Sequence, residues 1–242
     1  MPIRQTTNPR IRQFGALGDV HGQFDAARAI VARHPDIPFW LCVGDIADEH
    51  GRYESLGADV YWVHGNNDNF EAIAAGDLPG DLYYLGNTEI LTINDDAGEP
   101  VIDVLGLGGT FAPTWYDTPA DDLPHPRKRT TKATELADKR RHFVREEVEQ
   151  CKRFRGMKFD ILLTHEAAKP FRPYPGNRGP DAGKIQINEI LAAVKPRLHL
   201  FGHHHRFSDQ ICEDVRSVGL DLVTRSYILI DVQSLDIRLQ SL

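Results

Sequence analysis

Short apolar runs alternate with amphipathic stretches in the first third of the chain. Apolar runs between polar clusters predict buried strands, and apolar residues three to four positions apart predict a helix. The predicted strands lie at 14–17, 39–43 and 60–63, with a helix over 24–31. Asp68 followed by Glu71 resembles a capping box, which predicts a second helix through Ala75. This alternation predicts an α/β fold.

The rest of the chain continues the alternation and then becomes rich in strands. Further strands are predicted at 82–85, 89–93, 101–107, 161–164, 198–201, 217–223, 227–232 and 235–239, with a helix over 181–194. The chain has 242 residues, 41% of them hydrophobic and 26% charged, as in an ordinary folded protein. Because domains of about 100–200 residues are usual, we expect a single domain over 1–242.

Several protein classes are excluded by composition. No stretch approaches the roughly 20 consecutive apolar residues that cross a bilayer, and the polar start lacks the apolar core of a signal peptide. Cys42, Cys151 and Cys212 are far apart, form no CxxC pair and have apolar neighbours, which predicts buried thiols. We therefore expect a cytoplasmic protein with no membrane partner and no disulfide framework.

Basic charge is concentrated in one segment although the formal net charge is −7. Residues 127–158 contain twelve Lys or Arg and five Asp or Glu, within a predicted helical insertion at about 112–158. The favoured interpretation is a solvated helix face with ion pairs, and the alternative is a basic lid over an anionic substrate that uses Arg127, Lys128 and Arg129. Nucleic acid is a possible but not a favoured partner, since the acidic whole would repel it.

Side chains able to bind metal follow five predicted strands, at the point where each strand ends. They are Asp19, His21, Asp45, Asn66, His165, His203 and His205. Ligands of open α/β sheets bind beyond the carboxyl ends of the strands, so these residues are expected to meet. If the strand ends are extended, Asp19 and His21 project to one side, as do His203 and His205.

This donor set indicates the kind of metal. Carboxylate and amide oxygens suit hard divalent ions, whereas imidazole suits zinc, iron, manganese and nickel. Seven ligands are too many for one ion, but two ions bridged by a central carboxylate such as Asp45 would use them all. We expect a hydrolytic site with two divalent ions (Mn, Fe, Zn or Ni, with Mn favoured) and a metal-bound hydroxide as nucleophile.

In this order the motifs resemble those of the calcineurin-like metallophosphoesterase family, which reads DxH, GDxxD, GNH[DE], a distant His and GHxH. The matching residues are Asp19-Val20-His21, 44–48, 65–68, His165 and 202–205. The resemblance implies a four-layer αββα sandwich. It also implies a first ion on Asp19, His21, Asp45 and His205, and a second on Asp45, Asn66, His165 and His203.

The chain departs from the family pattern at Asn67, where the family usually has a histidine that protonates the leaving group. Asparagine can donate a hydrogen bond to a phosphoryl oxygen but cannot deliver a proton at neutral pH. The candidate substitute acids are His64, His125, His142 and His204. Asn67 and His204 are the candidate catalytic residues, although a structural role for His204 is favoured because it would point away from its neighbours.

Family members with a small polar residue at the position of Asn67 resemble phosphodiesterases, so a phosphodiesterase acting on a small molecule or nucleotide is favoured. The alternatives are a nuclease, a non-catalytic interaction module, and a phosphomonoesterase of protein-phosphatase or dinucleoside-polyphosphatase type, since GDVHGQ resembles the opening motif of those subfamilies.

The remaining predictions concern substrate contacts and two supporting carboxylates. Asn66 and Asn67 are predicted to contact substrate, and Arg172 and Arg178, in the Pro/Gly-rich loop 170–183, could do so, although an ordinary surface loop is favoured. Asp68 is expected to cap a helix, and Asp48 to support the site without binding metal.

Overall fold

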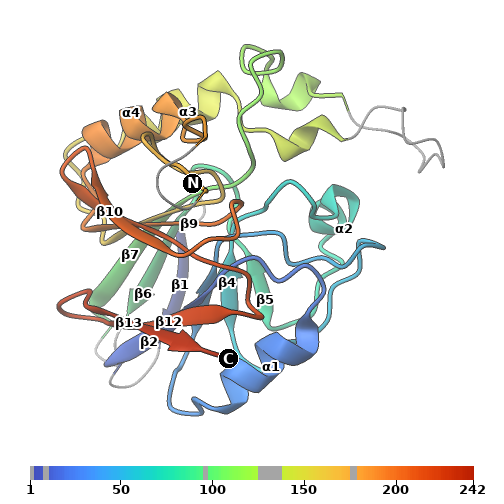
Figure 1. Ribbon diagram of the computed structural model, residues 1–242, viewed down its shortest axis with the longest axis vertical. Helices are drawn as coiled ribbons and strands as arrows, with labels where there is room; N and C mark the ends of the chain where they lie inside the picture. The colour runs from blue at the N-terminus through green and yellow to red at the C-terminus, as the bar shows by residue number, and fades with distance from the viewer. Residues whose placement is uncertain (1–2, 8–10, 95–97, 125–137, 175–178) are drawn as a thin grey trace.

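Two mixed β-sheets pack face to face in the computed structural model, which describes residues 3–7, 11–94, 98–124, 138–174 and 179–242 (Figure 1). The seven-stranded sheet has the order β1-β6-β7-β8-β9-β11-β10. Its strands are β1 (Ile3–Thr7), β6 (Ile90–Asn94), β7 (Pro100–Leu107), β8 (Ile161–Thr164), β9 (Leu198–Phe201), β10 (Ser208–Cys212) and β11 (Val215–Gly219).

The six-stranded sheet has the order β13-β12-β2-β3-β4-β5. Its strands are β2 (Gln13–Leu17), β3 (Trp40–Cys42), β4 (Val60–Trp62), β5 (Leu82–Tyr84), β12 (Ser226–Asp231) and β13 (Ile237–Ser241). The neighbours from β2 to β5 are parallel, as are β7, β8 and β9. Each sheet therefore gathers the carboxyl ends of its central strands at one edge.

Helices cover the outer face of each sheet. Helix α1 (Phe24–Ala32) packs on the six-stranded sheet, and α2 (Phe70–Ala75) lies beyond the ends of β4 and β5. Helices α3 (Arg145–Lys152) and α4 (Ile185–Val194) pack on the seven-stranded sheet (Figure 1). These layers form the four-layer αββα sandwich that was predicted.

The central strands are continuously apolar because both of their faces are buried. Leu41 of β3 points into the core between the two sheets, whereas its neighbours Trp40 and Cys42 pack on the side of α1. All three are fully buried. The other two cysteines, Cys151 and Cys212, are also buried, as their apolar neighbours predicted.

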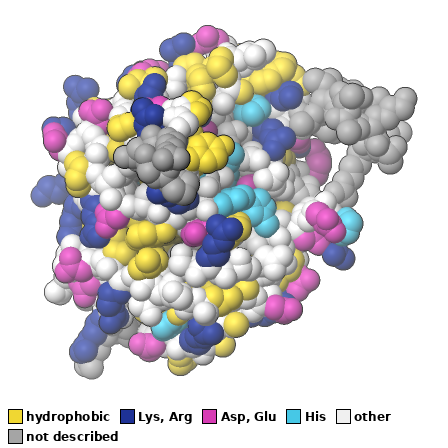
Figure 2. Space-filling view, viewed as in Figure 1, with side chains coloured by type: hydrophobic (Ala, Val, Ile, Leu, Met, Phe, Trp, Pro, Cys, Tyr) yellow, Lys and Arg dark blue, Asp and Glu magenta, His cyan; other side chains and the backbone are white. Residues whose placement is uncertain are grey.

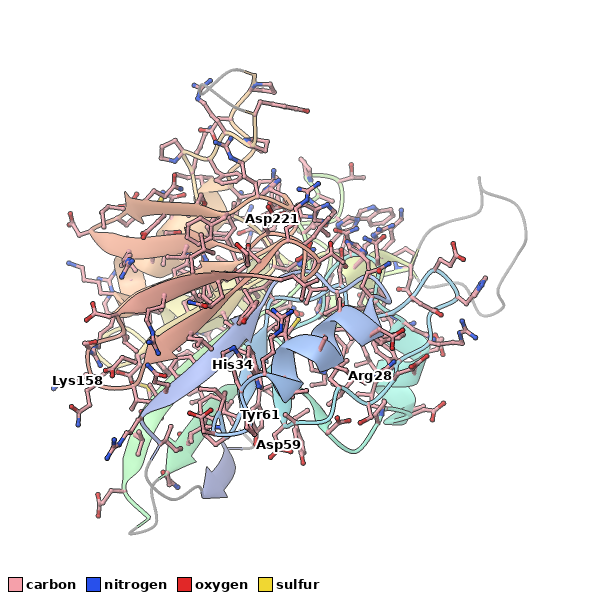
Figure 3. The ribbon with its side chains drawn as sticks, turned by 60° about the horizontal axis from the view of Figure 1, so that its bottom comes forward. Arg28, His34, Asp59, Tyr61, Lys158 and Asp221 are labelled. Atoms are coloured by element: carbon pink, nitrogen blue, oxygen red, sulfur yellow. The ribbon has the colours of Figure 1, made fainter. Side chains whose placement is uncertain are left out.

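Helix α1 is tied to the rest of its layer through Arg28 at its middle and through His34 just beyond its end (Figure 3). Arg28 bonds the carboxylates of Asp25 and Glu54 at 2.6 and 3.0 Å. His34, just beyond the helix, lies 2.9 Å from the hydroxyl of Tyr227 on β12. Among the described residues no helix is both long and apolar enough to cross a membrane.

The sequence predictions missed or misplaced elements at the sheet margins. Strands β1 and β10 were not predicted, because IRQTT and SDQIC carry few apolar residues and lie at the two edges of their sheet. Helix α4 begins at Ile185, four residues after Asp181, whose carboxylate accepts bonds from the amides of Phe171 and Gly183. Asp181 therefore orders the preceding loop.

The interval 112–158 contains two short 3-10 helices, η1 (Ala120–Asp122) and η2 (Lys139–Arg141), followed by α3. Three of its eight described basic residues pair with acids: Arg140 with Asp138 and Glu71, Arg145 with Asp117, and Lys152 with Glu149 and Glu189. These pairs are of the kind that the favoured interpretation, an ion-paired helix face, predicts. Arg127, Lys128 and Arg129 lie outside the described residues.

Candidate metal centre

The seven predicted ligands lie in loops that follow five parallel strands, and both sheets contribute. Asp19 and His21 follow β2, Asp45 follows β3 and Asn66 follows β4, while His165 follows β8, and His203 and His205 follow β9. Because these carboxyl ends meet at one edge of the sandwich, loops far apart in sequence come together there. Histidine side chains are visible near the centre of this face in Figure 2.

Two groups of side chains have ligand atoms close enough to share an ion. Asp19, His21 and His205 form one group, and Asp19, Asp45 and His165 form the other, with all ligand atoms of a group within 4.8 Å of one another. In the first group Nε2 of His205 lies 3.0 Å from both Oδ2 of Asp19 and Nε2 of His21. The groups share Asp19, whereas the family resemblance implies that Asp45 is shared.

Asp45 nevertheless occupies the middle of the cluster. Its Oδ2 atom lies 3.6 Å from Nε2 of His21 and 3.6 Å from Nε2 of His165. Asn67 donates to both oxygens, from its backbone N–H to Oδ1 at 2.7 Å and from its side chain to Oδ2 at 2.8 Å. Asp45 therefore faces both groups, which is what a bridging ligand requires.

The second group is completed by residues around His165. Nδ1 of His165 lies 2.8 Å from the carbonyl oxygen of Val43 and must donate to it, so Nε2 keeps its lone pair. That Nε2 lies 3.3 Å from Oδ1 of Asn66. The His203 ring centre is 5.0 Å from that of His165, and the His203 backbone N–H donates to Asp19. All seven predicted ligands thus lie in one region.

Electrostatic coupling is strong because the cluster is buried. Burial opposes the charged form of His165, but the carboxylates of Asp45 and Asp19 and the carbonyl of Val43 raise its pKa overall. Burial likewise opposes ionisation of Asp45, but His165 and the Asn67 amides lower its pKa. Burial lowers the pKa of His203 to about 4, so that ring is neutral, as a metal ligand must be.

The donor chemistry fits divalent cations. Two buried carboxylates, Asp19 and Asp45, contribute negative charge that the described protein atoms neutralise only through nearby imidazoles. At least one imidazole, that of His165, has the tautomer fixed for coordination through Nε2. Mixed oxygen and nitrogen donors in buried positions are typical of transition-metal sites. The family and this donor set agree that the site could hold metal.

The backbone of the ligand loops is left-handed, not extended. His21, Asp45, His203 and His205 have φ of 46, 51, 66 and 49°, among nine non-glycine residues with positive φ in the described chain. The prediction that each ligand pair projects to one side assumed that the strand ends are extended, and that assumption was wrong. Left-handed non-glycine residues cost of order 1–3 kcal/mol each and cluster at functional sites.

Glycines make the close approach of these loops possible. Gly44, which precedes Asp45, has φ of 112°, and a Cβ atom there would lie 2.6 Å from the Gly65 nitrogen and 2.9 Å from Nδ1 of His165. A Cβ at Gly202 would lie 2.3 Å from Oδ1 of Asp19. Any side chain at either position would push the ligand loops apart.

Asp68 does not cap a helix, contrary to the sequence prediction. The cap of α2 is Asn69, whose side chain accepts from the Ala72 amide at 3.2 Å. The buried Asp68 carboxylate instead accepts four backbone N–H bonds of 2.7–3.1 Å, from Asp45, Ile46, Ala47 and Gly65. Burial and the charge of Asp45 raise the pKa of Asp68. Asp68 thus holds two ligand loops together.

Asp48 was also predicted to support the site without binding metal. Its carboxylate accepts from the amides of His50 and Arg52 at 2.8 Å each and pairs with the Arg52 guanidinium. These bonds, mainly the one from the Arg52 amide, lower the pKa of Asp48 to about 2. Asp48 therefore stabilises the turn 48–52 beside the centre and is in neither metal group.

Two of the candidate acids have polar partners outside the two metal groups. Nε2 of His204 lies 3.2 Å from Oε1 of Glu166, and its ring packs against Phe171 at a centroid distance of 4.7 Å and against the predicted ligand His203 at 4.8 Å. His204 therefore does not point away from both neighbours as predicted, but its bond to Glu166 agrees with the structural role that was favoured. Nδ1 of His142 lies 3.1 Å from the Thr110 hydroxyl.

Burial lowers the pKa of His64 to about 3, and His125 lies outside the described residues.

The four predicted substrate contacts do not all lie at the site. Asn66 and Asn67 lie in the cluster, whereas Arg172 is exposed and donates to the Gly179 carbonyl of its own loop at 2.7 Å. Arg178 lies outside the described residues.

Sequence reasoning missed Glu166, which follows the ligand His165 directly. This residue is 1% exposed, and its carboxylate meets His204 and lies 3.8 Å from the Lys184 ammonium. Burial opposes its charge, but the bond from His204 and the charges of His203 and Lys184 lower its pKa. A glutamate directly after an apolar strand was the available signal, since such a residue needs a buried partner.

Comparison with known proteins agrees with the geometry. The calcineurin-like phosphoesterase family model matches residues 12–207, so the chain belongs to the calcineurin-like phosphoesterase family, a family of phosphoester hydrolases. A comparison with curated proteins finds no match.

Solved structures share the fold at low identity. The protein TT1561 of Thermus thermophilus is 14% identical with a TM-score of 0.63, covering 96% of this chain and 99% of that chain. GAP50, the anchor in the inner membrane complex of Plasmodium, is 10% identical with a TM-score of 0.51, covering 96% and 88%. An archaeal phosphodiesterase is 10% identical with a TM-score of 0.44, covering 95% and 99%. The first two likenesses concern the fold alone.

Proposed function

We propose that the protein is a di-metal-dependent phosphodiesterase that acts on a small phosphodiester or a nucleotide. The observation that carries this proposal is the pairing of Asn67 with Asp45 in the middle of the cluster. The side chain beside the reacting centre is therefore an amide, which donates hydrogen bonds but has no proton to give at neutral pH. Esters whose leaving group needs no protonation are the substrates that such a centre suits best.

The ligand roles follow the family resemblance, with Asp45 as the bridge. Asp19, His21, Asp45 and His205 would hold the first ion, and Asp45, Asn66, His165 and His203 the second. When bound, the ions would lower the pKa of a coordinated water and polarise the phosphoryl oxygens, which promotes attack on phosphorus.

The chain's own groups orient these ligands. The Val43 carbonyl keeps the proton on Nδ1 of His165, and the four N–H bonds to Asp68 fix the loop of Asp45. Asn67 is assigned the donor role toward a phosphoryl oxygen. Its side-chain N–H already lies in the cluster, 2.8 Å from Oδ2 of Asp45.

The proposal is tested by turnover of two esters with the same chromophore. Metal-stripped protein reconstituted with manganese is expected to hydrolyse bis(p-nitrophenyl) phosphate with a kcat/KM about tenfold or more above that for p-nitrophenyl phosphate, as a phosphodiesterase should. Both esters release p-nitrophenolate, which leaves without a proton, so this comparison tests the substrate class and not the missing acid. Preference for the monoester would reject the phosphodiesterase assignment. Absence of both activity and bound metal would favour the interaction module.

A second prediction concerns the proton donor itself. Asn67→His is expected to raise turnover of glycerol 2-phosphate, a monoester whose alkoxide leaving group needs a proton, relative to turnover of bis(p-nitrophenyl) phosphate by about tenfold or more, because a positioned acid contributes roughly 10²–10⁴-fold. The measurement is the ratio of the two kcat/KM values over pH 5.5–8. Asn67→Gln, which adds no titratable group, is the control and should leave the ratio unchanged. An unchanged ratio in Asn67→His would show that the amide is not the cause of the preference.

A further inference from the structure

A second pocket lies between α2 and the insertion, beside the metal centre. Its volume is about 270 Å³. Phe70 and Ala74 of α2, Tyr84 at the end of β5, Arg140 of η2, and His64 and His142 are among the residues that line it. Neither metal group includes any of these residues, so the pocket is a separate feature of the same face.

Most polar side chains of the pocket already have partners. Asn87 donates to Glu147 at 2.8 Å and accepts from the Gly108 amide at 2.6 Å, and Glu147 accepts from the Val144 amide at 2.8 Å. The Arg140 guanidinium is occupied by Asp138 and Glu71. These groups form a fixed wall and offer few free hydrogen bonds to a ligand.

His64 is different. It is 4% exposed, and its Nδ1 lies 2.9 Å from the Tyr84 hydroxyl, but its Nε2 has no hydrogen-bond partner among the described residues. A buried polar atom without a partner is destabilising, so a group bound in the pocket that reached this nitrogen would be stabilised by a hydrogen bond to it. His142, whose Nδ1 faces Thr110, supplies a second imidazole to the same pocket.

The size and walls of the pocket select a flat ring system. An apolar cavity of roughly 150 Å³ accepts benzene, so 270 Å³ has room for a bicyclic heteroaromatic ring. The His64 and Phe70 rings meet edge to face at 5.3 Å, and Arg140 lies over Phe70, which makes an aromatic wall. A purely aliphatic ligand would leave Nε2 of His64 unsatisfied, whereas a nucleobase carries ring nitrogens and exocyclic groups that can bond it.

The pocket and the metal centre are joined by one short loop. His64 is followed directly by Gly65, Asn66 and Asn67, and the Gly65 amide is held by Asp68 together with the amide of Asp45. A ligand in the pocket thus lies against the same loop that presents the second metal group. We propose that this pocket binds the nucleobase of a nucleotide phosphodiester whose phosphate lies at the metal centre, an inference that rests on the proposed function for its catalytic part.

The binding part is tested without catalysis. Calorimetric titration of metal-stripped full-length protein with adenosine should show binding. Ala74→Trp, which places a large ring at the pocket rim, and His64→Phe, which keeps a ring but removes Nε2, should each weaken binding about tenfold or more. Ala75→Trp is the matched control, because Ala75 is the exposed neighbour on α2 and is not among the lining residues. Circular dichroism of each variant confirms that it is folded.

The outcomes separate the two proposals. Adenosine binding that is lost in the folded Ala74→Trp variant and kept in Ala75→Trp supports the pocket even if no ester is hydrolysed. No binding at millimolar adenosine, or equal binding by both tryptophan variants, overturns it even if bis(p-nitrophenyl) phosphate is turned over. With active enzyme, the p-nitrophenyl ester of adenosine 5′-phosphate should exceed methyl p-nitrophenyl phosphate in kcat/KM about tenfold or more, and Ala74→Trp should bring that ratio close to one.

Discussion

Asp45→Asn is expected to remove metal binding and phosphoester hydrolysis together. Oδ2 of Asp45 lies 3.6 Å from a histidine nitrogen of each group, so one carboxylate serves both halves of the centre. Asparagine has nearly the same shape but lacks the charge and one of the two oxygens. Loss of the metals should remove several kcal/mol of transition-state stabilisation, which is about 10³-fold or more in kcat/KM.

The measurement for Asp45→Asn pairs metal content per chain after dialysis with kcat/KM for bis(p-nitrophenyl) phosphate. Asp25→Asn is the charge control, because Asp25 is exposed on α1, pairs with Arg28 and belongs to neither metal group. The control should keep both metal and activity. A variant at Asp45 that retains its metal complement and activity within tenfold of the wild type would show that Asp45 is not the bridge.

Asp68→Ala is expected to be the most destabilising single substitution in the ligand loops. It leaves four backbone N–H groups without an acceptor, and two of them belong to Asp45 and Gly65. Because a buried unsatisfied donor costs about 1–3 kcal/mol, we expect a loss of about 3 kcal/mol or more in the free energy of unfolding. Metal affinity should fall as well, because the loop that presents Asp45 loses its support.

Urea unfolding of the metal-free proteins measures the effect of Asp68→Ala, with metal titration of the same samples. Asn69→Ala is the matched control, since it removes the cap of α2 and should cost only about 1 kcal/mol. Equal destabilisation by the two variants would contradict the role given to Asp68. Asp68→Asn, which keeps an oxygen acceptor, should lie between them.

The meeting of the seven candidate ligands in one region could be predicted because their signal is local. Each follows an apolar run, and parallel strands bring their carboxyl ends together whatever the detailed topology. The four layers follow from the same alternation, since strands buried on both faces need cover on both sides. Edge strands gave no such signal: only Cys212 of β10 is buried, and β1 pairs with β6 across more than 80 residues of chain.

The supporting residues could not be predicted, because their roles depend on tertiary neighbours. Asp68 has the spacing of a capping box, yet the approach of the loop after β3 gives it buried donors that a helix terminus would not. Glu166 finds His204 across 38 positions. The missing partner of Nε2 of His64 could not be predicted either, because it depends on how Tyr84, Gly108 and the insertion pack around the ring.

Four candidate ligands have a left-handed backbone: His21, Asp45, His203 and His205. Thermal stability and the proposed chemistry therefore favour different residues at these positions. Glycine or asparagine would occupy those conformations with less strain, so a library selected only for thermal survival should accumulate such replacements at these positions. The variants with the highest thermal stability would then be those that have lost candidate metal ligands. Stabilising substitutions should therefore be sought in α1 or on the outer faces of α3 and α4, where lower backbone strain does not require the loss of a candidate ligand.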